Sequence, residues 1–119
     1  MLSVDYYGEQ GWQAIDFIER YNLDFKLGNA VKYLFRAGKK TKSSVKDLSK
    51  AYWYLNRHFS KYQNLVLDVS YDDIYVYVVK GSLDVKFVPV IYNALNNHEI
   101  ALLILSNIIN NMILNDNDN

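Results

Sequence analysis

The chain has 119 residues, half of them hydrophobic, 15% aromatic and none cysteine, and its formal net charge is zero. Such a chain suits one domain or two very small ones with a packed core, which excludes global disorder, disulfides and thiolate metal sites. Its first residues lack the basic and apolar regions of a signal peptide, and its apolar runs are shorter than the roughly 18 residues of a membrane span, so we expect a cytoplasmic protein with no membrane partner.

Three amphipathic helices are predicted in residues 1–62. The first covers about residues 9–21, and the second covers about residues 24–37, where Gly38 is a natural stop. The third begins at residue 43 or 44 and has the clearest helical spacing of apolar residues in the chain. We therefore predict a basic three-helix unit over residues 1–62.

The second half, residues 63–119, allows two interpretations up to residue 88. Residues 65–69 and 74–79 are rich in Val, Ile and Tyr, which favours strands. However, Ser70 is followed by acidic residues, which indicates the start of a helix, and Gly81 is a suitable stop. We predict a mainly α fold, a small helical bundle. The alternative is an α+β fold with a β-hairpin in the second half.

Two further helices are predicted towards the end of the chain. Ser82 and Asp84 could open one of them, and Pro89 would kink that helix or be confined to its first turn. Asn97 is a plausible N-cap for the last helix, over about residues 98–112. This last helix is apolar nearly all round, which predicts a homo-oligomer that forms through it.

A short repeat relates the two halves. The sequence Leu-Asp-Phe-Lys at residues 23–26 recurs as Leu-Asp-Val-Lys at residues 83–86, an offset of 60. The second half is then a diverged copy of the first three helices, packed on the first half or forming an interface. The alternative is a chance match.

The charges are distributed unevenly over the chain. Residues 1–62 hold 11 Lys or Arg and 6 Asp or Glu, net +5, and residues 63–119 hold 2 and 7, net −5. Such asymmetry indicates an anionic partner for the first half, although charge complementarity between the halves or between subunits would also account for it.

A basic stripe carries the strongest chemical signal. Its members share one helical face and continue across the loop into the third helix: Lys32, Arg36, Lys39, Lys40, Lys42, Lys46 and Lys50. Arg can hold phosphate with two hydrogen bonds, and Lys adds point charge. Tyr33 could stack on a base, and Gly28 and Asn29 lie where free N–H groups of a helix start favour anions. The alternative is a solvated helix face.

Other kinds of site find less support. His58 and His98 have no nearby Ser and acid in the sequence and are more simply helix caps. Asp16 and Glu19 have the spacing of a metal-binding pair, but no second pair follows, so we predict no metal and no cofactor. The segment 38–41 fails the phosphate-loop pattern, because residue 33 is Tyr and residue 40 is Lys.

Four motifs occur in order within residues 5–57. Residues 5–7, 13–16, 28–40 and 47–55 follow the pattern Asp-His-Tyr, Glu-Ala-Ile-Asp, Gly-Asn-Ala-x-Lys-Tyr-x-x-Arg-Ala-Gly-Lys-Lys and Asp-Leu-x-Lys-Ala-x-x-Tyr-Leu. In this order they resemble a small family of bacteriophage proteins of unknown function. Members are often labelled nucleotide kinase-like. Here Tyr6 replaces the family His and Gln13 replaces the family Glu. The resemblance retains these residues: Asp16, Gly28, Asn29, Lys32, Tyr33, Arg36, Lys39, Lys40, Asp47 and Lys50.

The resemblance and the basic stripe together lead to a hypothesis about function. We expect a phage-encoded protein that binds a nucleotide or related phosphate through Asp16, Asn29, Lys32, Tyr33, Arg36, Lys39 and Lys40. Because the lost His and Glu are the groups suited to proton transfer or metal binding, kinase-like catalysis is secondary. The alternative is a non-catalytic counter-defence or host-takeover protein that inhibits a bacterial protein or sequesters a nucleotide signal. Nucleic acid is the least expected partner, because the second half is acidic.

Overall fold

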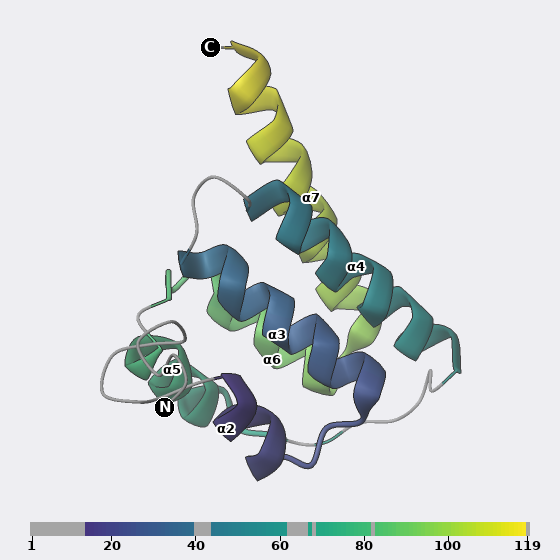
Figure 1. Cartoon of the computed structure of the whole chain (residues 1–119), viewed down its shortest axis with the longest axis vertical. Coiled ribbons are helices and arrows are strands. Elements are labelled where there is room, and N and C mark those ends of the chain that lie inside the picture. Colours follow the sequence, from purple (N-terminus) through teal and green to yellow (C-terminus); the bar gives the residue numbers. More distant parts are fainter. Residues whose placement is uncertain (1–13, 40–43, 62–66, 68, 82, 119) are drawn as a thin grey trace, which may run out of the picture.

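The computed structural model describes residues 14–39, 44–61, 67, 69–81 and 83–118. Within these residues the chain forms helices α2 (Ala14–Arg20), α3 (Phe25–Lys39), α4 (Ser44–Lys61), α5 (Tyr71–Lys80), α6 (Phe87–Asn96) and α7 (His98–Asp118), shown in Figure 1. The prediction of a mainly α fold is therefore confirmed. The β-hairpin alternative is wrong, because residues 74–79 lie in α5 and the described residues contain no strand.

Helix α5 forms although its sequence is rich in residues that favour strands. The Ser70 side chain accepts a hydrogen bond from Asp73 N at 3.1 Å, which caps the first turn. Ile74 and Val78 are one helical turn apart, and both are fully buried. Gly81 N donates to Tyr77 O at 2.9 Å at the other end. Helical spacing of the buried residues and good caps therefore outweigh the strand preference of Val, Ile and Tyr.

The other predicted helix boundaries compare as follows. Pro89 lies in the first turn of α6, where its missing N–H group leaves no helical hydrogen bond unmade. Ile100 N donates to the side chain of Asn97 at 3.3 Å, which confirms the predicted N-cap of α7. Helix α7 continues to Asp118, beyond the predicted end at residue 112. Residues 9–13 of the predicted first helix and most of the strand predicted over residues 65–69 lie outside the described residues.

Helices α3 and α4 lie antiparallel, with α6 beneath α3 and α7 beneath α4 (Figure 1). Helix α2 packs on α3, and α5 packs on α6. Leu34, Leu55 and Ile91 are fully buried between these layers. The C-terminal end of α7 projects beyond the rest of the molecule. In the described part of the chain, no helix combines the length and the apolar content that crossing a membrane requires.

The two halves use the same hydrogen bonds where their first helices end. Leu23 N donates to Ile18 O at 3.0 Å, and Leu83 N donates to Val78 O at 3.0 Å, an offset of 60 residues. Helices α2 and α3 also fall on α5 and α6 at this offset. The arrangement therefore follows the predicted repeat, while its origin by duplication stays a prediction.

Candidate phosphate-binding site

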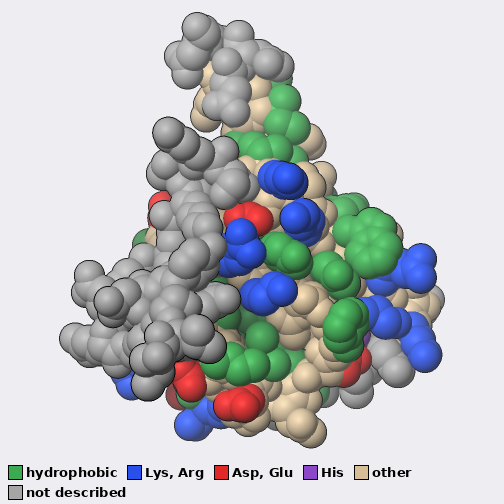
Figure 2. Space-filling view, in the orientation of Figure 1, with side chains coloured by type: hydrophobic (Ala, Val, Ile, Leu, Met, Phe, Trp, Pro, Cys, Tyr) green, Lys and Arg blue, Asp and Glu red, His purple; other side chains and the backbone are tan. Residues whose placement is uncertain are grey.

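The outer face of α3 and α4 is strongly basic. The two helices together carry eight Lys or Arg residues and one acidic residue, Asp47. Figure 2 shows several of these basic side chains gathered over the two helices, next to exposed apolar side chains. Like charges repel one another across such a face, so an anionic ligand would stabilise it.

Three cations surround the ring of Tyr33. Lys32 Nζ lies 4.7 Å from the ring centroid, Lys50 Nζ lies 5.3 Å from it, and Arg36 Cζ lies 5.8 Å from it. Two of these cations come from α3 and one from α4, so the site needs both helices. We call Lys32, Tyr33, Arg36 and Lys50 the Tyr33 cluster.

Asp47 lies buried beneath the Tyr33 cluster and is 2% exposed. Its Oδ2 is 3.9 Å from Arg36 Nε, beyond hydrogen-bonding distance. The Arg36 Nε is itself buried and has no hydrogen-bond partner among the described residues, whereas 34% of the Arg36 side chain is exposed. Asp47 therefore orients the guanidinium from below without using up its outer donors.

Helical spacing produces this arrangement. Lys32, Tyr33 and Arg36 occupy one outer face of α3, while Val31 and Leu34 face the core and are fully buried. On α4 the outer face holds two rows with intervals of three or four residues, which share their ends and differ at Trp53 and Tyr54: Lys46, Lys50, Trp53 or Tyr54, and Arg57. Asp47 is the buried polar residue at the edge of that face.

At the N-terminus of α3, where the sequence suggested an anion site, two backbone N–H groups already donate within the chain. Leu27 N donates to Asp24 Oδ1 at 2.9 Å, and Gly28 N donates to Asp24 O at 2.7 Å. Gly28 is buried, and a Cβ added to it would lie 3.4 Å from Ile18. Gly28 N and Leu27 N therefore have partners already, and Gly28 lies against the Ile18 side chain of α2.

The remaining predicted site residues are placed as follows. The Asn29 side chain donates to Phe25 O at 2.8 Å, within its own helix. Asp16 has an exposed side chain on α2, whereas the cluster is built from α3 and α4. The Lys39 side chain and all of Lys40 lie outside the described residues. The structure thus brings together Lys32, Tyr33 and Arg36 of the predicted set.

Sequence reasoning missed an aromatic patch that adjoins the Tyr33 cluster. Tyr54 stacks on Tyr33, with ring centroids 6.0 Å apart and an interplanar angle of 12°. Phe25 and Trp53 each contact the Tyr54 ring. We call Phe25, Trp53 and Tyr54 the aromatic patch. Its signal in the sequence was the spacing of Lys50, Trp53 and Arg57 on one face of α4.

The two histidines are not simple exposed caps. His58 is 1% exposed and His98 is 4% exposed, and their ring centroids lie 4.9 Å apart. His58 Nδ1 lies 3.3 Å from Asp24 Oδ2. Burial lowers the pKa of His58, and burial together with the neighbouring His58 lowers the pKa of His98. The pair joins α4 to the start of α7 inside the core.

A metal site has no support in the described part of the chain, which contains no group of three or more His, Cys, Asp or Glu side chains that could hold an ion. The Tyr33 cluster offers cations and ring faces, which suit an anionic or aromatic ligand rather than a metal.

Comparison with known proteins places the site within a recognised region. Residues 3–56 match the model of a family described as a protein of unknown function, DUF3310. This match overlaps the region of the sequence resemblance over residues 5–56, and it contains the Tyr33 cluster and the aromatic patch. The searches of curated proteins and of solved structures returned no match.

Proposed function

We propose that the protein binds a nucleotide or a related phosphate ligand on the outer face of α3 and α4. The observation that supports this most is the placing of three cations within 6 Å of the Tyr33 ring centroid, with one buried carboxylate beneath them. A face with this excess of positive charge gains most from a ligand of concentrated negative charge.

Each member of the cluster has a defined part in this proposal. Arg36 supplies the planar donors that fit phosphate oxygens in pairs. Lys32 and Lys50 add charge from either side, one from each helix. Tyr33 supports the cations through its ring face, where cation–π contacts of this kind are each worth about 0.5–1 kcal/mol at exposed sites. Lys39 and Lys40 would extend the basic row, as the sequence stripe suggests.

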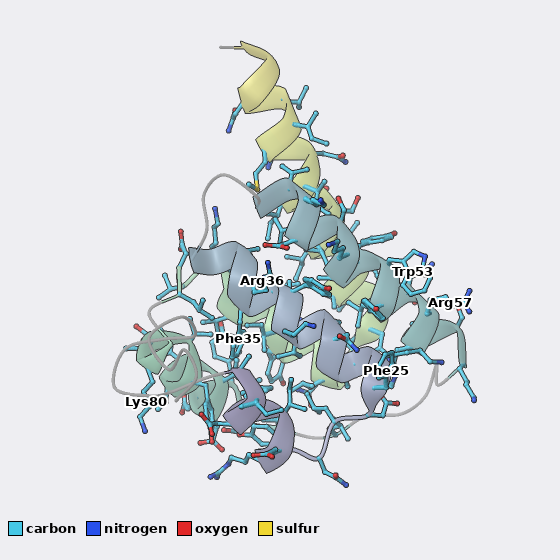
Figure 3. The ribbon with its side chains drawn as sticks, viewed as in Figure 1. Phe25, Phe35, Arg36, Trp53, Arg57 and Lys80 are labelled. Carbon is cyan, nitrogen blue, oxygen red and sulfur yellow. The ribbon has the colours of Figure 1, made fainter. Side chains whose placement is uncertain are left out.

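Calorimetric titration tests the proposal. The ligands are nucleoside mono-, di- and triphosphates, cyclic nucleotides and inorganic tripolyphosphate. Arg36→Ala and Lys50→Ala should each weaken binding of the best ligand by about tenfold, the loss expected for one charge-assisted contact. Lys80→Ala removes an exposed cation from α5, far from the cluster in Figure 3, and should leave the affinity unchanged. Lack of binding by every ligand would refute the proposal.

Phosphotransfer is a secondary part of this proposal. Phosphate positioning and charge supply much of such catalysis, and the cluster offers both. However, the sequence carries Tyr6 and Gln13 where the resembled family has His and Glu. We therefore expect binding without appreciable transfer of phosphate from ATP to nucleoside monophosphates. Sequestration of a nucleotide signal, or inhibition of a bacterial protein during phage infection, would use tight binding of this kind without turnover.

We also propose that the protein self-associates through α7. Leu103, Ile113 and Leu114 of this helix are 63%, 42% and 59% exposed. The latter two lie towards the end that projects beyond the rest of the molecule in Figure 1. A second copy of α7 would remove these apolar groups from water. Light scattering should give a dimer or larger for the parent protein and a monomer for Leu114→Lys, and a monomeric parent would contradict the proposal.

A further inference from the structure

The aromatic patch next to the Tyr33 cluster is unusually open to solvent. The side chain of Phe25 is 74% exposed, and that of Trp53 is 55% exposed. Leaving two large rings in water forgoes the free energy of burying them. Both rings lie on the side of α3 and α4 that also presents Arg36 and Arg57, as Figure 3 shows. The patch and the basic face are therefore one surface.

Ring contacts connect the patch to the cluster. Tyr33 stacks on Tyr54 at 6.0 Å, and the Tyr54 ring meets Trp53 at 5.0 Å and Phe25 at 6.2 Å. Beyond Trp53, Arg57 Cζ lies 5.2 Å from the Trp53 ring centroid. Adjoining rings therefore run from the Tyr33 cluster to the N-terminal end of α3 and the C-terminal end of α4, with cations beside Tyr33 and Trp53.

This row of rings, with cations beside Tyr33 and Trp53, favours one class of ligand. Sites for single nucleotides are concave and enclose most of their ligand. Phe25 and Trp53 stand out from the surface, as their exposed fractions show, so they do not form the walls of such a pocket. Proteins that bind single strands combine a row of cations along the phosphates with open rings on which successive bases stack.

The acidic residues of the second half lie on other elements than this surface. Its acidic residues with described side chains are Asp72 and Asp73 on α5, Asp84 in the loop before α6, and Glu99 on α7. None of them belongs to α3 or α4, where Asp47 is the single acidic residue. The sequence made nucleic acid the least expected partner because the second half is acidic. That charge does not describe α3 and α4, which carry eight Lys or Arg residues and one acidic residue.

We propose that the phosphate ligand is a single-stranded oligonucleotide, with phosphates on Arg36, Lys50 and Arg57 and bases stacked on Phe25 and Trp53. This inference rests on the proposed function, because it names the ligand class of the same site. It adds the aromatic patch as a part of that site.

Fluorescence gives a direct test, because the chain has two tryptophans and Trp12→Phe leaves Trp53 as the sole reporter. This variant is titrated with a thymidine oligonucleotide of about ten nucleotides, within the range of single-strand site sizes. We expect quenching of Trp53 emission and an affinity that falls steeply with salt concentration. Thymidine monophosphate should bind much more weakly and quench little.

Variants of the patch complete the test in the full chain. Phe25→Leu and Trp53→Leu, followed by fluorescence anisotropy of a labelled oligonucleotide, should each weaken binding by roughly fivefold to a hundredfold. Tyr75→Leu, which changes a ring on α5 that is 48% exposed, is the matched control and should have no effect. Circular dichroism should show the parent helix content in all three, since these rings are exposed.

The outcomes separate this inference from the proposed function. Binding of thymidine monophosphate or tripolyphosphate without binding of the oligonucleotide overturns the inference and keeps the proposed function. Equal oligonucleotide affinities for the parent, Phe25→Leu and Trp53→Leu also overturn it. Absence of binding by all three ligands overturns both.

Discussion

Helices α2 to α4 and helices α5 to α7 share one hydrogen bond at an offset of 60 residues but differ in the charges that they carry. Helices α3 and α4 carry eight Lys or Arg residues and one acidic residue, whereas α6 and α7 carry no Lys or Arg and three acidic residues. The family match covers residues 3–56 and so ends within α4. The candidate site therefore belongs to the first half, and the second half supplies the core behind it.

One pair of positions illustrates the difference. At the offset of 60 residues, Asn96 in α6 corresponds to Arg36 in α3. Arg36 extends to the outer face beside Tyr33, whereas the Asn96 side chain accepts a hydrogen bond from Val69 N at 3.2 Å and donates to Val69 O at 3.3 Å. At corresponding positions, the first half therefore has an outward cation, Arg36, and the second half has Asn96, which binds the backbone of the loop before α5.

The largest expected effect on stability comes from Phe17, which packs between the two halves. Phe17 is fully buried and contacts Tyr77 and Phe35 with ring centroids 5.2 and 5.6 Å apart. Phe17→Ala should lower the free energy of unfolding by about 3–5 kcal/mol, measured by urea denaturation. The exposed Phe25→Ala is the control and should change it by less than about 0.5 kcal/mol. Two separate unfolding transitions in the parent would show that the halves fold independently.

A smaller loss of stability is expected when the hydrogen bonds of Asn96 to Val69 are removed. Asn96→Ala removes partners of Val69 N and O and should cost about 1–3 kcal/mol, because these backbone groups are partly buried. Asn107→Ala alters an exposed side chain of α7 and should be nearly neutral. If the two variants were equally stable, Asn96 would not hold the loop as described.

The buried histidines make stability depend on pH. The folded-state pKa values of His58 and His98 lie below the ordinary value of 6.5, so the unfolded chain binds protons more readily than the folded chain. The free energy of unfolding should be highest above about pH 6.5. Below that pH it should fall by at most about 1.4 kcal/mol per pH unit for each histidine. Thermal unfolding from pH 8 to pH 5 measures this. His98→Leu should reduce the dependence of the unfolding temperature on pH. The same dependence in this variant and the parent would contradict a role of His98.

Local patterns in the sequence predicted much of the fold. Ser70 and Gly81 indicated the ends of α5, and Asn97 indicated the start of α7, because capping depends on residues a few positions apart. The extension of α7 to Asp118 was not predicted, since its last residues are Asn and Asp, which are weak helix formers.

The candidate site was predicted only in part, because contacts between helices depend on how they are aligned. Spacing along α3 placed Lys32 and Arg36 on one face. The stacking of Tyr33 on Tyr54 requires the register between α3 and α4, which no local pattern contains. The meeting of His58 and His98 depends likewise on how α4 packs against α7.

The central claim is that phosphate groups bind on the basic face of the first half. The most direct measurement is a nuclear magnetic resonance titration of the isotope-labelled full chain with inorganic tripolyphosphate. The backbone amide signals of Lys32, Tyr33, Arg36 and Lys50 should shift, and so should the Nε–H signal of Arg36. The amide signals of α5 to α7 should stay unchanged. Shifts concentrated in α5 to α7, or no saturable shifts at millimolar tripolyphosphate, would contradict the account.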